Sequence, residues 1–180
     1  MNQYKKPSES RISISELMLP SHSNFSGKIH GGYILSLMDQ IAFACASKHS
    51  ETYCVTASVD KVDFLKPVEV GELVTMKASI NNVGTTSMVV GVRVEAENIM
   101  TGKVKHCNSS YFTMVAKDTN GKSVEVPGLI LENETAVRRF VRSIYRKEEM
   151  KVRRDRFKSS EFQLETHLEL LKKHNVKVDL

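Results

Sequence analysis

Residues 30–48 read HGGYILSLMDQIAFACASK, and this stretch decides the fold because it predicts a long central helix. It contains no proline, it is rich in helix-forming residues, and its apolar residues fall on every face of a helix. A helix that is apolar all round is typical of a protein interior. A helix from Gly32 to about Lys48 would have roughly four to five turns. We therefore expect one buried helix that the rest of the domain must cover.

Strand-like segments lie on both sides of this helix. Alternating apolar and polar residues predict strands at 11–19, 53–65, 73–83, 87–97 and 103–116. Short turns at Gly84 and Gly102 join the later strands, so we expect the four strands after the helix to form an antiparallel meander. The phase of alternation changes near Asp60 and Lys61, which predicts a β-bulge there. The predicted fold is α+β, with an antiparallel sheet wrapped around one long helix.

The length and composition predict one domain followed by an extension. We assign residues 11–117 to the domain, 118–133 to a turn-rich linker and 134–180 to a basic helical C-terminal extension. The formal net charge is +5, and ten of the 26 Lys and Arg residues lie between Arg138 and Lys158. Acidic residues interleave with them and no recognised nucleic-acid-binding module is present. We therefore expect a solvated, partly paired helix and no nucleic-acid partner. Binding of a nucleotide or of acidic partners by this segment is the alternative.

The cysteines and the N-terminal residues predict the compartment. Cys45, Cys54 and Cys107 show no CxxC spacing, and reduced thiols are typical of the cytoplasm. Residues 1–10 lack the apolar core of a signal peptide, and no run approaches the roughly 20 apolar residues of a membrane span. We expect a soluble cytoplasmic protein without a membrane segment. A metal site is not expected, because the histidines show no paired ligand spacing.

One residue of the predicted helix is out of place in an apolar segment. Asp39 is the only charged residue between Gly31 and Ser47. Burying a carboxylate costs free energy unless it is paired or used in a reaction. The structural explanation is a buried Asp satisfied by the backbone or by a partner chain. The functional explanation is a base or nucleophile whose basicity is raised by burial.

The surroundings of Asp39 favour the functional explanation. It follows Gly32 by about two turns on the same helix face. The unpaired N–H groups of Gly31 and Gly32 at the helix start could hold developing negative charge, an arrangement suited to acyl transfer. Asn24, in the preceding loop, could orient a water or polarise a carbonyl, although a loop Asn is more often a turn former.

Three segments are similar to acyl-CoA thioesterases of the hotdog fold. They are NFSGKIHGGYILSLMDQIA (24–42), VTASVDKVDFLKPVEVGE (55–72) and GTTSMVVGVRVEAEN (84–98). The resemblance covers roughly residues 13–156 and points to the branch with the bacterial YciA-type enzymes and the mammalian brain acyl-CoA hydrolase. Its most specific part is the Asn-x-x-Gly-x-x-His-Gly-Gly block followed by Leu-Met-Asp.

The resemblance implies a hotdog fold whose active sites lie between protomers. Asp39 matches the catalytic carboxylate and Asn24 the catalytic asparagine, contributed by opposite protomers. The substrate would be acyl-CoA, no separate cofactor would be needed, and a homohexamer built as a trimer of dimers would resemble relatives. The carbonyl oxygen would lie near the Gly32 N–H. Asp39 would act as general base on water or attack the thioester directly.

Basic and small polar groups are expected along the path of the coenzyme A phosphates. The candidates are the tight loop Gly84, Thr85, Thr86 and Ser87, and the charged residues Lys61, Lys66 and Arg93. His30 and Gly31, at the helix start, are further candidates for substrate binding. For the charged residues, a solvated surface position is an equally good explanation.

Other functions remain open from the sequence. His30 could be the base, although we favour a residue held by backbone contacts at the helix start. An acyl-thioester dehydratase would pair a catalytic histidine with an acid in a different motif. A non-catalytic hotdog module that binds acyl-CoA or nucleotide is the main alternative, but binding alone requires no buried carboxylate.

Overall fold

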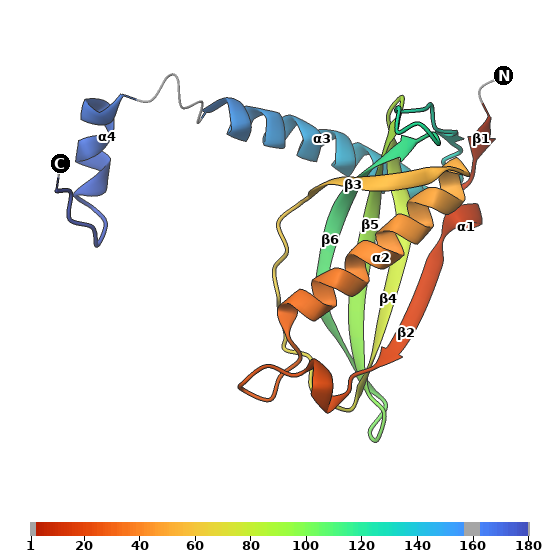
Figure 1. Cartoon of the computed structure of the whole chain (residues 1–180), viewed down its shortest axis with the longest axis horizontal. Helices are drawn as coiled ribbons and strands as arrows, with labels where there is room; N and C mark the ends of the chain where they lie inside the picture. Colours follow the sequence, from red (N-terminus) through yellow and green to blue (C-terminus); the bar gives the residue numbers. More distant parts are fainter. Residues whose placement is uncertain (1–2, 157–162, 180) are drawn as a thin grey trace. The chain divides into compact units, whose positions relative to one another are not determined.

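A five-stranded antiparallel sheet curls around one long helix (Figure 1). The structure is a computed structural model that describes residues 3–156 and 163–179. The strand order is β2-β4-β5-β6-β3, and the central helix is α2 (Gly31–Ser50). The strands are β2 (Ile12–Leu17), β3 (Tyr53–Val59), β4 (Glu72–Val83), β5 (Ser87–Asn98) and β6 (Lys103–Lys117). The predicted α+β hotdog architecture is confirmed.

Helix α2 forms where the sequence predicts it and is buried along one face. His30 is its N-cap, and Glu51 ends it in the left-handed conformation with its N–H bonded to the Ser47 carbonyl at 2.8 Å. The side chains of Met38, Ala42 and others on this face pack against the sheet. The described residues leave the opposite face, with Gln40 and Phe43, exposed, so the prediction of burial all round is wrong for the part of the chain that the structure describes.

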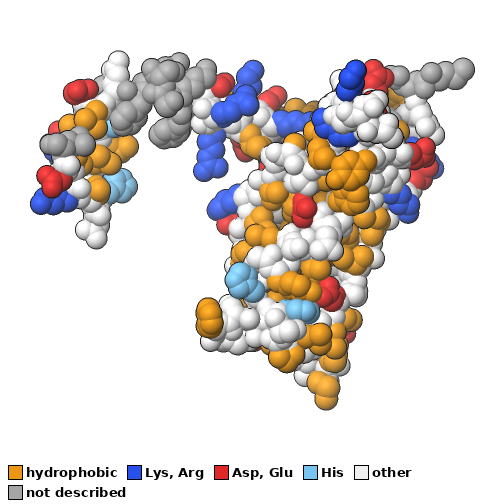
Figure 2. Space-filling model, in the orientation of Figure 1, with side chains coloured by type: hydrophobic (Ala, Val, Ile, Leu, Met, Phe, Trp, Pro, Cys, Tyr) orange, Lys and Arg blue, Asp and Glu red, His pale blue; other side chains and the backbone are white. Residues whose placement is uncertain are grey.

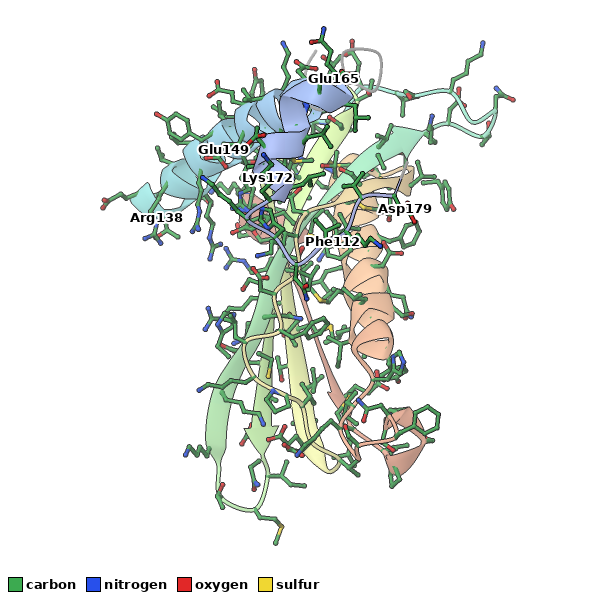
Figure 3. All side chains as sticks on the ribbon, turned by 90° about the vertical axis from the view of Figure 1, so that its left-hand side faces the viewer. Phe112, Arg138, Glu149, Glu165, Lys172 and Asp179 are labelled. Atoms are coloured by element: carbon green, nitrogen blue, oxygen red, sulfur yellow. The ribbon has the colours of Figure 1, made fainter. Side chains whose placement is uncertain are left out.

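The inner face of the sheet follows the predicted alternation. Val74, Met76, Ala78 and Ile80 of β4 are all at most 2% exposed. Their antiparallel neighbours on β5 are the buried apolar residues Val90, Val92, Val94 and Ala96. Phe112 of β6 is 1% exposed and completes this layer (Figure 3). Because side chains alternate with period two along a strand, this pattern fixes the face that α2 covers.

Strand β3 is not part of the predicted meander. It pairs antiparallel with β6, at the opposite edge of the sheet from β2. Segment 60–71, which joins β3 to β4, is too long for a tight hairpin and crosses the sheet. The register shift lies between Thr56 and Ser58, earlier than the predicted bulge. At Asp60 the strand has already ended, which explains the change of phase.

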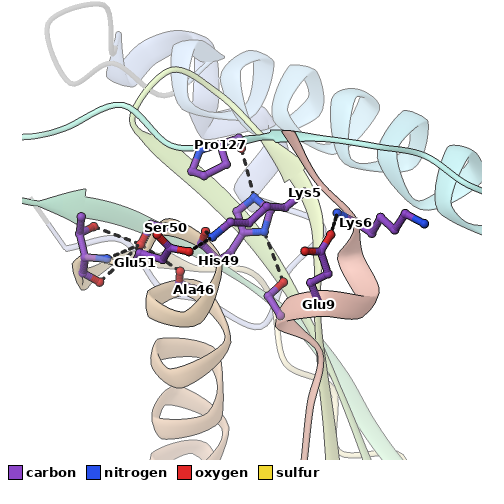
Figure 4. Close-up of polar contacts among 10 residues, drawn as sticks. Lys5, Lys6, Glu9, Ala46, His49, Ser50, Glu51 and Pro127 are labelled. Carbon is purple, nitrogen blue, oxygen red and sulfur yellow. Dashed lines mark hydrogen bonds and ion pairs between the residues drawn. The ribbon is translucent and has the colours of Figure 1, made fainter. Parts of the chain in front are cut away.

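Short N-terminal elements cover the C-terminal end of α2. Strand β1 (Tyr4–Lys5) pairs in parallel with β7 (Gly128–Leu129), and α1 (Pro7–Ser10) follows it. Lys5 Nζ donates to the His49 carbonyl at 3.0 Å and pairs with Glu51 (Figure 4). The His49 ring lies within hydrogen-bonding distance of Ser10 Oγ (3.3 Å) and the Pro127 carbonyl (3.1 Å). This network fastens three segments that are distant in sequence.

The chain forms two compact units, residues 1–143 and 144–180. The first also contains η1 (Pro20–His22) and the beginning of α3 (Glu134–Arg156). The second contains the rest of α3 and α4 (Leu164–Leu171). None of the described helices combines the length and apolar character that a membrane span requires.

Candidate active site

The Asp39 side chain lines a groove between α2 and β3. The groove has a volume of about 560 Å³ and is lined by Asp39, Gln40, Phe43, Tyr53, Cys54, Val55 and Thr56. Asp39 is partly exposed within the single chain. The expectation of a fully buried carboxylate is therefore wrong, because the Asp39 face of α2 lies outside the sheet's cover. The carboxylate is accessible to a molecule that enters the groove.

A hydroxyl group holds one oxygen of this carboxylate. Thr56 Oγ1 donates a hydrogen bond to Asp39 Oδ1 at 2.6 Å. Thr56 lies on β3 immediately before the register shift. Asp39 Oδ2 has no hydrogen-bond partner among the described residues. One oxygen is thus fixed in position, and the other is free to accept a proton or to attack a carbonyl carbon.

The local sequence pattern does not single out Thr56. The signal that could have found it is a hydroxyl residue in a strand that otherwise alternates Val55, Ala57 and Val59. Only the pairing of β3 beside α2 shows that this hydroxyl reaches a carboxylate 17 positions earlier in the chain.

The start of α2 is organised by His30. Its Nδ1 accepts a hydrogen bond from the Gly32 N–H at 3.0 Å, so the expected backbone contact of His30 is confirmed. A Cβ at Gly31 would lie 3.2 Å from the Phe64 ring, so the Gly31 backbone packs closely under that ring. In this arrangement the Gly32 N–H reaches a substrate oxygen only after the imidazole turns away.

Asn24 organises the loop before α2. Its Oδ1 accepts hydrogen bonds from the Ser26 N–H (3.0 Å), the Ser26 hydroxyl (2.8 Å) and the Lys28 N–H (3.2 Å). The Nδ2 amide donates to no residue that the structure describes. The turn-forming role of Asn24 is therefore present, and its amide hydrogens remain available for another group.

The structure does not bring Asn24 and Asp39 into contact within one chain. No hydrogen bond joins them, and Asp39 lies about 10 Å along the helix axis from Gly32, given the rise per residue. Asn24 precedes the helix start by several residues. A site that uses both side chains on one small group would therefore draw them from two copies of the chain.

The predicted phosphate contacts are dispersed. Lys61 pairs with Asp63 at 2.9 Å, and Arg93 pairs with Glu95 at 2.8 Å. Lys66 is exposed in segment 60–71. The loop Gly84, Thr85, Thr86 and Ser87 connects β4 to β5, and the Thr86 and Thr85 carbonyls accept from Ala116 and Val126. That loop is fastened to β6 and to the segment after it.

The surface around the groove is apolar, and one edge of the neighbouring strand β3 pairs with no other described strand. Phe43 and Tyr53 meet edge to face with ring centroids 5.5 Å apart. Val59, Phe64 and Leu65 are also exposed. Hydrophobic side chains gather over α2 and β3 in Figure 2. Strand β3 pairs only with β6 among the described strands, and an exposed apolar edge strand is a surface that another chain can cover.

The described residues contain no group of three or more His, Cys, Asp or Glu side chains placed to hold a metal ion. The three cysteines are free and buried, and burial raises the pKa of the Cys45 thiol to about 12.

The chain is similar in sequence and fold to known proteins. The model of the Thioesterase superfamily matches residues 26–103. Protein VdlD of Helicobacter pylori is 42% identical over 138 residues, which are 77% of this chain and 79% of that one. The crystal structure of an apo-hexameric acyl-CoA thioesterase matches with a TM-score of 0.82 and 37% identity, covering 84% of this chain and 97% of that one.

A second solved structure carries information on individual residues. An acyl-CoA hydrolase from Staphylococcus aureus, in complex with butyryl coenzyme A, coenzyme A and coenzyme A disulfide, matches with a TM-score of 0.79 and 33% identity, covering 85% of this chain and 93% of that one. Structures of its variants with one aspartate, one asparagine or one threonine replaced by alanine are also similar. The fold, the family match and these identities together show that the chain belongs to the thioesterase superfamily.

Proposed function

We propose that this protein hydrolyses acyl-CoA thioesters to a free acid and coenzyme A. The observation that carries the proposal is the state of the Asp39 carboxylate in an accessible groove. One of its oxygens accepts a hydrogen bond from Thr56, and the other has no partner among the described residues. The family membership and the coenzyme A complexes of the S. aureus enzyme support coenzyme A thioesters as the substrate class.

The spacing of three residues supports their assignment to the reaction. The asparagine and aspartate replaced in the S. aureus enzyme are 15 positions apart, and the threonine follows the aspartate by 17. Asn24, Asp39 and Thr56 have the same two spacings in this chain. We assign Asp39 as the reacting carboxylate, Asn24 as the group that positions water or the carbonyl, and Thr56 as the residue that orients Asp39.

The proposed site is shared between two protomers. Within one chain Asn24 and Asp39 are separated, whereas the open edge of β3 and the apolar groove beside it suit a second copy. Association at this edge would bring a partner chain to Asp39 and exclude water from the apolar wall. We propose a dimer of this kind, assembled into a homohexamer as in the hexameric acyl-CoA thioesterase.

Two chemical routes are compatible with the Asp39 geometry. In the first, the carboxylate takes a proton from water while the water oxygen attacks the thioester carbon; the C–S bond then breaks and the thiolate takes the proton. In the second, the carboxylate attacks directly, the thiolate leaves, and water hydrolyses the resulting anhydride. Donation by the Gly32 N–H to the developing oxyanion would require the His30 ring to release it.

His30 and Gly31 would border the carbonyl, and Lys61, Lys66, Arg93 and loop 84–87 are the proposed contacts of the coenzyme A phosphates and backbone. No further cofactor is assigned, since coenzyme A is itself part of the substrate. We propose action in the cytoplasm, where three free thiols would stay reduced.

Purified full-length protein tests the proposal with a panel of short to long acyl-CoA substrates and a free-thiol readout. Release of free coenzyme A by the wild type and its loss in the Asp39→Ala variant are expected, with unchanged oligomeric state. A wild-type protein that binds acyl-CoA but releases no thiol from any substrate is a binding module and would contradict the proposal.

A further inference from the structure

A second pocket, of about 150 Å³, lies beside β4 and the first turns of α3. All of its lining residues belong to the unit 1–143. In the sheet, β5 and β6 separate β4 from β3, which places β4 roughly 14 Å across the sheet from the strand that borders the Asp39 groove. The pocket is therefore a separate feature of the molecule.

Two guanidinium groups give the pocket a positive charge. Arg11 and Arg139 both line it, and neither forms an ion pair or hydrogen bond within the part of the chain that the structure describes. The carboxylate in the lining, Glu132, is already paired with Lys6 at 2.7 Å. Because Lys6 compensates Glu132, the charges of the two arginines remain uncompensated.

A buried hydroxyl in the same pocket lacks a partner. Ser79 is only 7% exposed, it lines the pocket, and its Oγ has no hydrogen-bond partner among the described residues. Buried polar atoms in native proteins are nearly always hydrogen-bonded, to protein, water or ligand. The Ser79 hydroxyl and the two guanidinium groups thus line one pocket as donors to which the described residues offer no acceptor.

The start of α3 adds a third contribution. Asn133 lines the pocket and caps the helix, accepting a hydrogen bond from the Ala136 N–H at 2.9 Å. Helix α3 is 23 residues long, and the positive end of such a helix attracts anions. Glu134, the acidic residue of the first turn, is not among the lining residues.

We propose that this pocket binds a phosphate group, supplied either by inorganic phosphate or by a nucleotide. Guanidinium groups, a hydroxyl and a helix N-terminus are the donors that proteins use for phosphate oxygens. The pocket volume suits the phosphate group itself, and the rest of a nucleotide would lie outside it. Nothing in the proposed hydrolysis requires this site, so either proposal can be wrong without affecting the other.

Calorimetric titration of the full-length oligomer with sodium phosphate, at ionic strength held constant with chloride, tests the proposal. We expect one site per chain. The Arg11→Gln/Arg139→Gln double variant should weaken binding at least about tenfold, because each charge-assisted hydrogen bond contributes more than a neutral one. Arg138→Gln removes one positive charge from an α3 residue (labelled in Figure 3) that does not line the pocket, and it should leave the affinity within about twofold.

A parallel titration with ADP separates the two sources of phosphate. Binding of ADP about tenfold tighter than inorganic phosphate, with the same loss in the double variant, identifies a nucleotide site. Equal or weaker binding identifies inorganic phosphate. If the double variant does not melt like the wild type, Ser79→Ala takes its place, with an expected weakening of several-fold for one neutral donor.

Three results would overturn the proposal. They are no saturable binding at millimolar phosphate, equal binding by the wild type and the variants, or equal weakening by Arg138→Gln, which would show diffuse charge attraction only. Hydrolysis measured in phosphate-free buffer should be the same for the wild type and the double variant. Because binding is measured without substrate, a protein that failed to hydrolyse acyl-CoA would still test the pocket.

Discussion

Asp39 and His49 lie on the same helix, and their surroundings differ in almost every respect. His49 is completely buried, and both ring nitrogens have partners, at Ser10 and at the Pro127 carbonyl. Asp39 is partly exposed in a groove, with one oxygen bonded to Thr56 and the other without a partner in the described chain. A polar group whose atoms are all satisfied by its own chain stabilises the fold, whereas a half-satisfied one is available for chemistry.

The largest expected effect is on hydrolysis by Asp39→Asn. The amide keeps the shape of the side chain and can still contact Thr56, but it removes the base or nucleophile. We expect kcat to fall by about 10²–10⁴-fold, with an unchanged melting temperature and oligomeric state. Steady-state thiol release measures the rate, and activity within a few-fold of the wild type would assign Asp39 a structural role like that of His49.

His49→Phe should show the opposite behaviour, with lower stability and little direct effect on the chemical step. It leaves the Ser10 hydroxyl and the Pro127 carbonyl without their partner in a buried region. We expect a loss of about 2–3 kcal/mol in the free energy of unfolding. Thermal and urea unfolding measure this loss, and His49→Gln, which keeps a donor and an acceptor, should recover part of it.

Thr56→Val tests the same contrast because it removes the hydroxyl that bonds Asp39 at 2.6 Å and that also lies 3.4 Å from Met114 Sδ. The replacement has nearly the same volume, so the groove is retained while the carboxylate loses its fixed orientation. We expect kcat to fall about 10- to 100-fold, since hydrogen bonds to charged groups contribute roughly 1.5–3 kcal/mol. Thr56→Ser is the matched control and should stay close to the wild type; equal rates for both variants would remove Thr56 from the site.

The smallest expected effect is the pH dependence of stability that His49 contributes. Burial lowers the pKa of His49, so the unfolded chain binds a proton at a higher pH than the folded chain does. The stabilising contribution is therefore present above the unfolded pKa of about 6.5 and is lost as the pH falls toward the lower folded pKa. Melting temperatures from pH 7.5 downward should decrease less steeply in His49→Phe than in the wild type.

The local patterns predicted the elements well, because they record which face of each element is buried. The alternation of Met76 and Ala78 placed β4 correctly, and the apolar run after Gly32 placed α2. The pairing of β3 was predicted wrongly, since strand order depends on where segment 60–71 crosses, and no local periodicity records this. The lone charge at Asp39 marked the candidate site.

The parts of the site that depend on tertiary contacts could not be predicted. Thr56 was missed because its role comes from β3 lying beside α2. His49 was missed because it lies in the polar segment at the helix end, which resembles an exposed terminus. The exposure of Asp39 was predicted wrongly because a helix that is apolar all round can be covered by a second chain as well as by its own sheet.

The three free cysteines are all buried, and the raised pKa of Cys45 keeps that thiol protonated at neutral pH. Only thiolates react readily with disulfide reagents. A chromogenic thiol reagent added to the folded protein would therefore record liberated coenzyme A with little background from the catalyst. A further slow increase in colour, up to three equivalents per chain, would measure the fraction of protein that has unfolded and exposed its cysteines. One assay would therefore report both the rate of hydrolysis and the stability of the folded protein.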